Sequence, residues 1–438
     1  DGFADIVVGA RGGDGPQGSA SLSGEVFVIF GRDAQSLPQT VDLRALDGAN
    51  GFVIHGRDPG DSAGGAVACG DVNGDGFDDV VVGAASAGGP NNALDQCGGV
   101  YLVFGKASGW PASVLVADLD GSDGAVFYGN SLRDRLGSSV AVADVNGDGL
   151  DDVVMGAPGG DGASGSTTTD NCGEVHVLFG NISYPAQLMV SALDGSNGFT
   201  VYGSDVNDGL GGSVAAGDVN GDGLGDIVIG CKDGNGYMNL LNEAGEAYVV
   251  FGVPGSRAAS LDVAQLDGSN GFALFGAEKS DKAGASVATG DVNADGYADI
   301  LVGTSGADGP DGSMGAGETH VVFGRPSGWS SYRRLSGWDG SNGCTVHGAA
   351  QYDGLGKAVA AADVNGDGFA DILMGSASAD SGEGAENGEV YVVFGGPVGT
   401  WNASVRVADL AGPNGFTVRG SSSYGHVGYS VAGGGITG

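Results

Sequence analysis

The sequence has few basic residues and no long apolar segment. No run of 18 apolar residues occurs in its 438 residues, so we expect no membrane-spanning helix and no direct membrane insertion. Lys and Arg number 17 against 54 Asp and Glu, which gives a formal net charge of −37. Because such a charge repels phosphate backbones, we expect no nucleic-acid partner. The chain begins within a repeat and without Met, so we expect any targeting segment to lie outside it.

Cysteine is scarce, and no CxxC pair occurs, so a zinc site is not expected. The five cysteines are Cys69, Cys97, Cys172, Cys231 and Cys344, an odd number. Cys97 and Cys172 take the same place in successive repeats. Bridges to neighbouring loops and buried free thiols are both compatible with this spacing, and the sequence leaves the pairing open.

Motifs for catalysis are also missing. The sequence has no nucleophile elbow, HExxH helix, Walker loop or dinucleotide fingerprint. His55 and His347 share one repeat position with aromatic residues, and His176 and His320 share another, so we interpret all four as packed substitutes for aromatics. His426 stands alone in a loop. We therefore predict that the chain is not an enzyme.

Helical periodicity is absent, which excludes an α-solenoid, whereas short β-branched runs recur at a fixed spacing. The first aspartates of the DVNGDG-type motifs lie 72 to 74 residues apart, at Asp71, Asp144, Asp218, Asp291 and Asp363. Each period contains four strand-like segments, represented by residues 139–141, 79–84, 388–395 and 198–203. Four strands per repeat are typical of a β-propeller blade. The 91 glycines are interpreted as turn residues, since no Gly-X-Y period is present.

Counting each strand-like segment gives six copies. The C-terminal residues 428–438 align with residues 137–147, and Asp1 continues the motif where Asp148 does. We therefore predict an all-β propeller of six four-stranded blades, closed by the C-terminal strand joining the N-terminal blade; seven blades are less favoured. The predicted single domain, 1–438, has blades at 1–60 with 425–438, 61–133, 134–207, 208–280, 281–352 and 353–424.

The DVNGDG-type loops have the composition of Ca²⁺ sites. Oxygen-bearing side chains stand at positions 1, 3, 5 and 9, position 7 offers a backbone carbonyl, and glycine at position 6 permits a tight turn. The predicted ligands are Asp71, Asn73, Asp75, Phe77 and Asp79; Asp144, Asn146, Asp148, Leu150 and Asp152; Asp218, Asn220, Asp222, Leu224 and Asp226; Asp291, Asn293, Asp295, Tyr297 and Asp299; and Asp363, Asn365, Asp367, Phe369 and Asp371.

An EF-hand and a metal-free Asx-turn are the two other structures with loops of similar composition. An EF-hand is excluded because no Glu stands at position 12 and strands, not helices, follow the loop. Asx-turns without metal are possible, but three carboxylates in nine residues would repel one another without a cation. We expect about five Ca²⁺ ions, which would bring the net charge from −37 to −27. In the sixth loop Gly435, Thr437, Asp1 and Asp5 occupy the ligand positions, and we expect weak binding or none.

Together, the DxNxDGxxD loop, the VGA strand end and the FG strand end resemble the FG-GAP repeats of integrin α-subunit heads and of secreted bacterial proteins. The LDGSNGF segments at 193–199 and 266–272 resemble the bacterial and marine versions. The resemblance covers essentially the whole chain. It implies calcium loops between the first and second strands of each blade, and ligand binding on the opposite face, by the loops between blades and between the second and third strands. The chain differs from integrin heads in having six repeats and no inserted adhesion domain.

Basic residues gather on the loops that join successive blades. The predicted ligand-binding residues are Arg57, Arg133, Arg135, Lys279, Lys282 and Lys357. Local charge balance on an acidic surface is one interpretation, and recognition of an anionic polysaccharide or carboxylate-bearing protein is the other. Asn181 and Asn402 begin Asn-X-Ser triplets and are candidate glycosylation sites.

These observations favour a calcium-stabilised module for adhesion or recognition, located extracellularly or at the cell surface, with a protein or glycan partner. The alternative is a self-assembling structural subunit of an extracellular filament, sheath or surface layer. A polysaccharide lyase that uses a calcium-bound substrate carboxylate is a third hypothesis, weakened by the lack of a convergent His, Lys and Tyr set.

Overall fold

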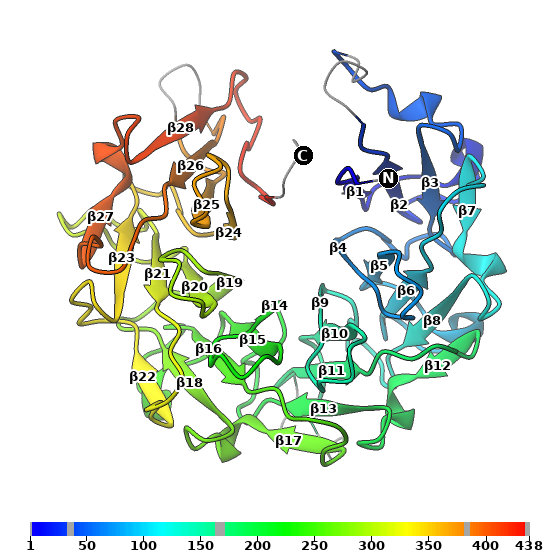
Figure 1. The fold of residues 1–438 in the computed structure, drawn as a ribbon, viewed down its shortest axis with the longest axis horizontal. Helices are drawn as coiled ribbons and strands as arrows, with labels where there is room; N and C mark the ends of the chain where they lie inside the picture. Colours follow the sequence, from blue (N-terminus) through cyan, green and yellow to red (C-terminus); the bar gives the residue numbers. More distant parts are fainter. Residues whose placement is uncertain (1, 33–38, 163–170, 381–385, 434–438) are drawn as a thin grey trace. The chain divides into compact units, whose positions relative to one another are not determined.

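The structure, a computed structural model, describes residues 2–32, 39–162, 171–380 and 386–433. It contains six β-sheets of four or five strands, and its helices there are short 3₁₀ turns (Figure 1). The predicted all-β, six-bladed propeller is confirmed. The described residues fall into two compact units, one comprising 2–206 and 253–261 and the other 207–252 and 262–433, apart from the gaps given above.

The first unit holds three sheets, ordered β1-β2-β3-β7, β4-β5-β6-β8-β12 and β9-β10-β11-β13-β17. Their strands are β1 (Ile6–Ala10), β2 (Glu25–Ile29), β3 (Gly51–His55), β4 (Ala66–Gly70), β5 (Asp79–Ala84), β6 (Gly99–Val103), β7 (Ser113–Leu115), β8 (Gly124–Tyr128), β9 (Ser139–Ala143), β10 (Asp152–Ala157), β11 (Glu174–Leu178), β12 (Gln187–Met189), β13 (Gly198–Tyr202) and β17 (Ser260–Asp262).

The second unit holds sheets ordered β14-β15-β16-β18-β22, β19-β20-β21-β23-β27 and β24-β25-β26-β28. Their strands are β14 (Ser213–Gly217), β15 (Asp226–Cys231), β16 (Glu246–Val250), β18 (Gly271–Phe275), β19 (Ala283–Gly290), β20 (Asp299–Thr304), β21 (Glu318–Val322), β22 (Tyr332–Arg334), β23 (Gly343–His347), β24 (Ala358–Ala362), β25 (Asp371–Ser376), β26 (Glu389–Val393), β27 (Ser404–Arg406) and β28 (Gly415–Arg419).

Short 3₁₀ turns lie in the connections between strands. They are η1 (Pro16–Gly18), η2 (Leu43–Ala45), η3 (Pro90–Asn92), η4 (Val116–Asp118), η5 (Val190–Ala192), η6 (Tyr237–Asn239), η7 (Val263–Gln265) and η8 (Val407–Asp409). No helix in these parts of the chain is long and apolar enough to cross a bilayer.

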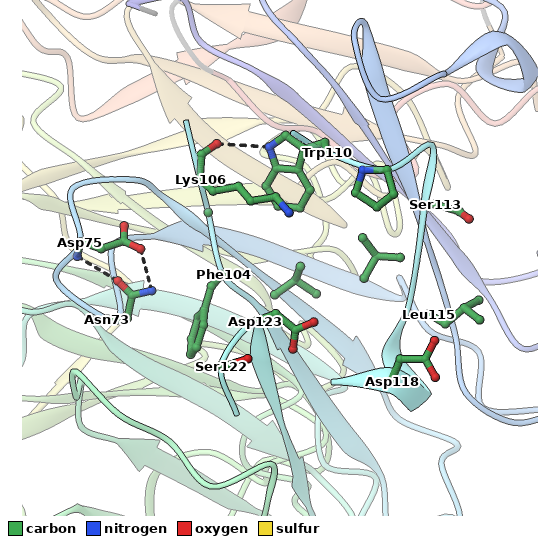
Figure 2. Close-up of a pocket in the computed structure, with 14 residues that line it drawn as sticks. Asn73, Asp75, Phe104, Lys106, Trp110, Ser113, Leu115, Asp118, Ser122 and Asp123 are labelled. Atoms are coloured by element: carbon green, nitrogen blue, oxygen red, sulfur yellow. Dashed lines mark hydrogen bonds between the residues drawn. The ribbon is translucent and has the colours of Figure 1, made fainter. Parts of the chain in front are cut away.

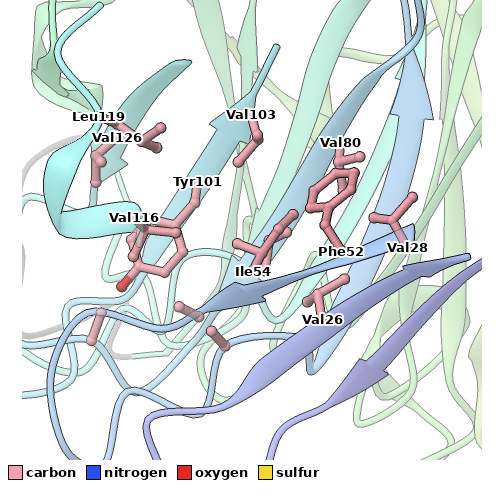
Figure 3. Packing of buried hydrophobic residues seen from close by; sticks show 14 of the residues in the cluster. Val26, Val28, Phe52, Ile54, Val80, Tyr101, Val103, Val116, Leu119 and Val126 are labelled. Carbon is pink, nitrogen blue, oxygen red and sulfur yellow. The ribbon is translucent and has the colours of Figure 1, made fainter. Parts of the chain in front are cut away.

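The second strand of a blade is apolar on both faces because it packs between two neighbouring sheets. All six residues of β5 are buried. Val80 and Val82 pack with Phe52 of the preceding sheet, whereas Val81 packs with Val153 of the following one. Figure 3 shows the first of these clusters, where side chains of β2 and β3 meet those of β5 and β6. This two-sided burial explains the uninterrupted valine runs.

A short additional strand, which the sequence did not reveal, extends five of the sheets and is the fifth strand in four of them. Each is three residues long and pairs in parallel with the outer strand of the preceding repeat, as Gln187 does with Val126. The same arrangement joins β7 to β3, β22 to β18 and β27 to β23. The connection between the third and fourth strands of one blade thus binds the previous blade.

The predicted closing strand lies partly beyond the described residues. Residue 1 and residues 434–438 fall outside them, and residues 429–433 form no strand. In the described part of the first sheet, β1 is therefore the edge strand.

Candidate metal-binding loops

Each of the five complete DxNxDGxxD motifs lies between the first and second strands of a sheet. The loops join β4 to β5, β9 to β10, β14 to β15, β19 to β20 and β24 to β25. The aspartate at position 9 begins the second strand in every case, so this buried strand also fixes one end of the loop.

Two loop positions have left-handed backbone. In the blade 2 loop Gly74 has φ of 74° and Gly76 has φ of 86°. The same conformation recurs at position 4 in the fifth blade, where Ala294 has φ of 54°. Glycine adopts these dihedrals without a Cβ penalty, which explains its frequency in the motif and makes Ala294 an exception.

Positions 1, 3 and 5 turn their oxygens toward the interior of the loop. In the blade 2 loop the Asp71 carboxylate accepts hydrogen bonds from the N–H groups of Gly74, Asp75 and Gly76 at 2.8, 3.1 and 2.9 Å. The Asn73 amide nitrogen donates to Asp75 at 3.1 Å. The loops of blades 3, 4 and 6 repeat the two bonds to position 1 from positions 4 and 6. The loop backbone is therefore organised around its acidic side chains.

Position 9 has a structural role that the sequence did not reveal. Asp79 is fully buried, and its two oxygens accept the N–H groups of Val72 at 3.1 Å and Gly105 at 2.7 Å. The corresponding pair of bonds forms at Asp152, Asp226, Asp299 and Asp371. This carboxylate ties the loop to the FG end of the third strand, which accounts for the joint recurrence of the two motifs.

Burial raises the pKa of the position 9 carboxyls. Desolvation is the main cause, and the carboxylates at positions 5 and 1 add to it. The pKa reaches about 7 at Asp79, Asp152 and Asp226 and about 8 at Asp299, and it is also raised at Asp371. An ionised group in this place lacks a compensating positive charge among the loop residues.

The donor set fits a hard divalent cation. Every side-chain ligand is an oxygen, and a carboxylate that accepts two hydrogen bonds keeps free lone pairs for a metal. Among the described residues, no DxNxDGxxD loop brings the oxygens of its three carboxylates within 4.8 Å of one another. The ligand atoms of Asp208, Cys231 and Glu246, elsewhere in blade 4, do lie that close together. The loops thus have the chemistry of a Ca²⁺ site in an open arrangement.

A cavity of about 500 Å³ adjoins the blade 2 loop (Figure 2). Asn73 and Asp75 line one side, and Asp123 and Lys106 line another. The Lys106 ammonium lies 4.5 Å from the centre of the Trp110 ring. Three carboxylates, of Asp75, Asp118 and Asp123, and one ammonium therefore border the cavity.

The sixth loop is described from Gly2 to Asp5, and Asp5 is the one of its four side-chain ligand positions within that part. Asp5 Oδ1 accepts the N–H of Gly31 at 2.7 Å, as the position 9 aspartates do with their FG glycines. Asp1, Gly435 and Thr437 lie outside the described residues.

The predicted ligand-binding residues lie on the loops between blades, and several have acidic or aromatic neighbours. Arg57 bonds the Tyr128 hydroxyl and lies 3.7 Å from Asp58. The closest acidic contacts of Arg133 and Lys282 are longer, at 4.0 Å to Asp95 and 3.9 Å to Glu243. The Lys357 ammonium lies 5.0 Å from the Tyr429 ring centre, and Arg135 and Lys279 are exposed.

The remaining predicted positions are the two candidate glycosylation sites and the cysteines. Asn181 and Asn402 are both exposed. No disulfide joins any two of the five cysteines, all of which lie in the described residues; Cys69 is exposed and the other four are buried.

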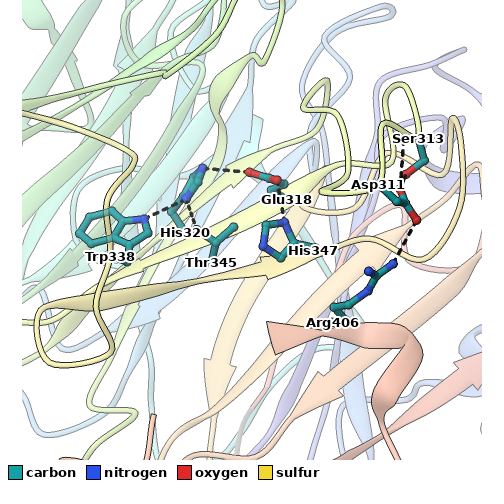
Figure 4. A network of polar contacts seen from close by, with 8 residues as sticks. All are labelled: Asp311, Ser313, Glu318, His320, Trp338, Thr345, His347 and Arg406. Carbon is teal, nitrogen blue, oxygen red and sulfur yellow. Dashed lines mark hydrogen bonds and ion pairs between the residues drawn. The ribbon is translucent and has the colours of Figure 1, made fainter. Parts of the chain in front are cut away.

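Four histidines contact glutamates, of which Glu174 is buried and Glu25 and Glu318 are half-buried. In blade 5, Glu318 lies 2.7 Å from His347 Nδ1 and 3.5 Å from His320 Nε2, while Trp338 donates to His320 Nδ1 at 3.2 Å (Figure 4). Burial lowers the pKa of His320 to about 4. His55 and His176 lie 3.2 Å from Glu25 and Glu174. The sequence signal for these contacts is the glutamate that begins the third strand in five repeats, because a carboxylate removed from water requires a polar partner.

Comparisons with known proteins agree with the repeat. The model of the FG-GAP repeat matches residues 63–96, 136–178, 210–250, 283–322 and 355–393. The chain is 36% identical over 165 residues to the phosphatidylinositol-glycan-specific phospholipase D of Bos taurus, covering 38% of this chain and 18% of that protein. It is 29% identical over 245 residues to integrin alpha pat-2 of Caenorhabditis elegans, covering 56% of this chain and 18% of the relative. It is also 29% identical over 196 residues to integrin alpha-PS2 of Drosophila melanogaster, covering 44% of this chain and 12% of the relative.

Proposed function

The chain is an integrin-like β-propeller built from FG-GAP repeats, and we propose that it is a calcium-stabilised extracellular module that recognises a protein or glycan partner. The observation that carries the proposal is the repetition, in five blades, of an oxygen-rich loop whose position 9 carboxylate is fully buried. A divalent cation would supply the positive charge that this carboxylate lacks.

The residues that would hold Ca²⁺ are the side chains at positions 1, 3, 5 and 9 and the carbonyl at position 7. Bound Ca²⁺ would neutralise the carboxylates and make the loop conformation independent of their protonation. The position 9 aspartate would serve both the ion and the FG strand end. Calcium would therefore stabilise the blade as well as the loop.

Partner recognition is assigned to the loops between blades, away from the calcium loops. Arg133 and Arg135 are exposed in blade 2 and both have left-handed backbone, with φ of 67° and 58°. Extended basic side chains on loops held by a rigid sheet suit an anionic protein or glycan. The integrin relatives support a recognition role, and Asn181 and Asn402 are accessible for glycosylation.

We propose no enzymatic activity for this chain. The phospholipase D relative carries an enzyme's name, but the match spans 18% of that protein's length. The histidines that could serve catalysis in the described residues of blades 1, 3 and 5 are buried against glutamates, where they have a structural explanation.

Metal analysis tests the calcium proposal. The native chain, dialysed against buffered Ca²⁺, is expected to retain about five ions, and Asp222→Asn is expected to retain one fewer because position 5 loses its charge. Asp194→Asn is the matched control, since Asp194 is an exposed loop aspartate bonded to Ser196 outside the metal motif. Equal calcium content in all three proteins would contradict the assignment.

Binding to an array of proteins and acidic glycans, with and without calcium, tests the recognition proposal. The double variant Arg133→Glu, Arg135→Glu is expected to lose binding to an anionic partner, whereas Lys106→Glu, beside the calcium loop, is expected to keep it. Unchanged binding by the double variant would assign recognition to another surface.

A further inference from the structure

A compact group of metal-ligating side chains lies in the second unit, apart from the DxNxDGxxD loops. The ligand atoms of Asp208, Cys231 and Glu246 all lie within 4.8 Å of one another. Asp208 precedes β14, Cys231 ends β15 and Glu246 begins β16. The three residues are 4%, 1% and 2% exposed, so the group is closed off from solvent.

Strand pairing and hydrogen bonds hold these residues together. Cys231 and Glu246 are directly opposite each other in the antiparallel pair of β15 and β16. The Cys231 thiol donates to the Asp208 carbonyl oxygen at 3.1 Å, which ties the loop before β14 to the end of β15. The Tyr248 hydroxyl donates to Glu246 Oε2. Burial, followed by the charges of Glu246, Cys231 and Asp208, raises the pKa of Tyr248, so its hydroxyl stays a donor.

The other repeats that begin the third strand with glutamate place a basic side chain against it. In blade 5, Glu318 contacts both His347 and His320 (Figure 4). In blade 6, Glu389 bonds Arg419 at 3.0 Å. The glutamates of blades 1 and 3 have histidine contacts as well. A positive or protonatable group is therefore the usual neighbour of this carboxylate.

Blade 4 departs from this arrangement and also introduces a thiol. The register partner of Glu246 is Phe275, whereas blades 5 and 6 have a histidine and an arginine at that position. Tyr248 likewise stands where blades 3 and 5 have histidine. The second strand ends in Cys231, where the other five blades have alanine, threonine or serine. Two carboxylates and a thiol enclosed together favour a cation that coordinates sulfur as well as oxygen.

We propose that Asp208, Cys231 and Glu246 bind one Zn²⁺ ion. The ion takes the Cys231 thiolate sulfur and one carboxylate oxygen from each acidic residue, and the thiol proton is released to solvent. Once that proton has left, the Asp208 carbonyl oxygen that accepted it is placed to complete a tetrahedral shell. Tyr248 is a positioning residue, because its hydroxyl acts through Glu246.

The donor set distinguishes this site from the Ca²⁺ loops. Ca²⁺ takes six to eight oxygen ligands, whereas Zn²⁺ accepts sulfur and oxygen together at four positions. Two atoms bound to one Zn²⁺ lie about 3.5 Å apart, so ligand atoms that already lie within 4.8 Å need only a small contraction. The absence of CxxC pairs favoured no zinc site, but these ligands come from three segments that the fold brings together.

Zinc analysis of the full chain in excess Ca²⁺ tests the assignment, because calcium then competes for the acidic loops. The native chain, dialysed against Zn²⁺ and excess Ca²⁺, is expected to retain a single Zn²⁺ ion. Cys231→Ser, which introduces the residue that blade 6 has in the same place, is expected to lose it. Cys69→Ser, at an exposed cysteine, is the matched control and is expected to keep it. Zinc retained equally by the native chain and Cys231→Ser, or by neither, would overturn the proposal.

Calcium content, measured in the same samples, separates the two metal proposals. Cys231→Ser is expected to keep the calcium of the native chain, because its change lies outside the DxNxDGxxD loops. Loss of zinc alone therefore reports on the Cys231 site, and a chain that binds zinc but no calcium would contradict only the calcium proposal.

Cobalt substitution gives a reading from the native chain itself. Co²⁺ in excess Ca²⁺ is expected to produce thiolate-to-metal charge-transfer absorbance, which Cys231→Ser lacks and Cys69→Ser retains. Absence of this absorbance in the native chain would exclude a sulfur ligand and overturn the proposal. Tyr248→Phe, which keeps the ring but cannot donate to Glu246, is expected to weaken zinc binding about 10–100-fold at unchanged calcium content. Unchanged zinc affinity in Tyr248→Phe would contradict the positioning role.

Discussion

One aspartate of the DxNxDGxxD motif has both a predicted function and an observed one. The position 9 carboxyl is both a predicted Ca²⁺ ligand and the acceptor of two backbone N–H groups. The sequence predicted the first function from spacing, because alternating oxygens are visible in the letters. It could not predict the second, because the Gly105 donor lies 26 residues from Asp79 and is brought there by strand pairing.

Ala294 offers a test of backbone strain in a loop. It occupies, with φ of 54°, the position that is glycine in the other four complete loops. Ala294→Gly is expected to raise the free energy of unfolding by up to about 1 kcal/mol, because the left-handed conformation costs a Cβ-bearing residue more than the added chain entropy of glycine.

The matched control reverses the change in another blade. Gly366 has φ of 77°, and a β-carbon there meets no atom within 4 Å, so Gly366→Ala introduces strain without a clash. It is expected to lower stability by about 1–2 kcal/mol in urea unfolding. A stabilising Gly366→Ala would contradict the argument.

The buried carboxyl of Asp134 predicts a dependence of stability on pH. Burial, followed by the charges of Glu174 and Asp161, raises its pKa from 3.8 to about 7. Between these values the folded state binds the proton and the unfolded state does not, so this group lowers stability as pH rises from 4 to 7.

Asp134→Asn keeps an oxygen for the Ser131 N–H but cannot ionise. The free energy of unfolding of the variant minus that of the native chain is expected to be larger at pH 8 than at pH 5, by on the order of 1 kcal/mol or more. Urea unfolding at fixed calcium measures it. Asp118→Asn, at an exposed position, is the control. If the variant and the native chain differ in unfolding free energy by the same amount at pH 5 and pH 8, Asp134 does not titrate in this range.

At the scale of elements, the four antiparallel strands of each blade were predictable and the fifth was not. The former have β-branched runs bounded by glycine, whereas β22 is three residues, Tyr332–Arg334, with no such signal. Its place is determined by long-range contacts. Trp329, just before it, stacks on Phe272 of the preceding repeat with ring centres 4.3 Å apart.

This stack is expected to contribute to the stability of neighbouring blades. Trp329 also carries the Arg325 guanidinium over its ring at 4.3 Å and donates from Nε1 to the Arg325 carbonyl. Trp329→Ala is expected to cost about 2–3 kcal/mol of unfolding free energy, less than for a fully buried tryptophan because the ring is half-buried. Trp329→Phe, which retains a stacking ring, is expected to recover more than half of the loss in the same denaturation experiment.

At the scale of the molecule, the dominant quantity is the net charge of −37. Self-repulsion of this size opposes compaction, and monovalent salt reduces it by screening over a Debye length of about 10 Å at 0.1 M. Sites for Ca²⁺ would act differently, because an ion bound only by the folded state stabilises it by mass action. The two effects can be separated by comparing salts at one ionic strength.

Calorimetry of the metal-free chain is expected to show a modest rise of Tm with NaCl and a much larger rise with CaCl2 at the same ionic strength. At a calcium concentration 100 times Kd, one site contributes about 2.7 kcal/mol, so even partial filling of five loops exceeds what screening of exposed charges provides. MgCl2 is expected to fall between the two, since Mg²⁺ demands a tighter octahedral shell than an open nine-residue loop offers. Coincident curves for CaCl2 and NaCl would mean that the acidic loops respond only to ionic strength, and the aspartates would then be explained by the backbone hydrogen bonds that they accept.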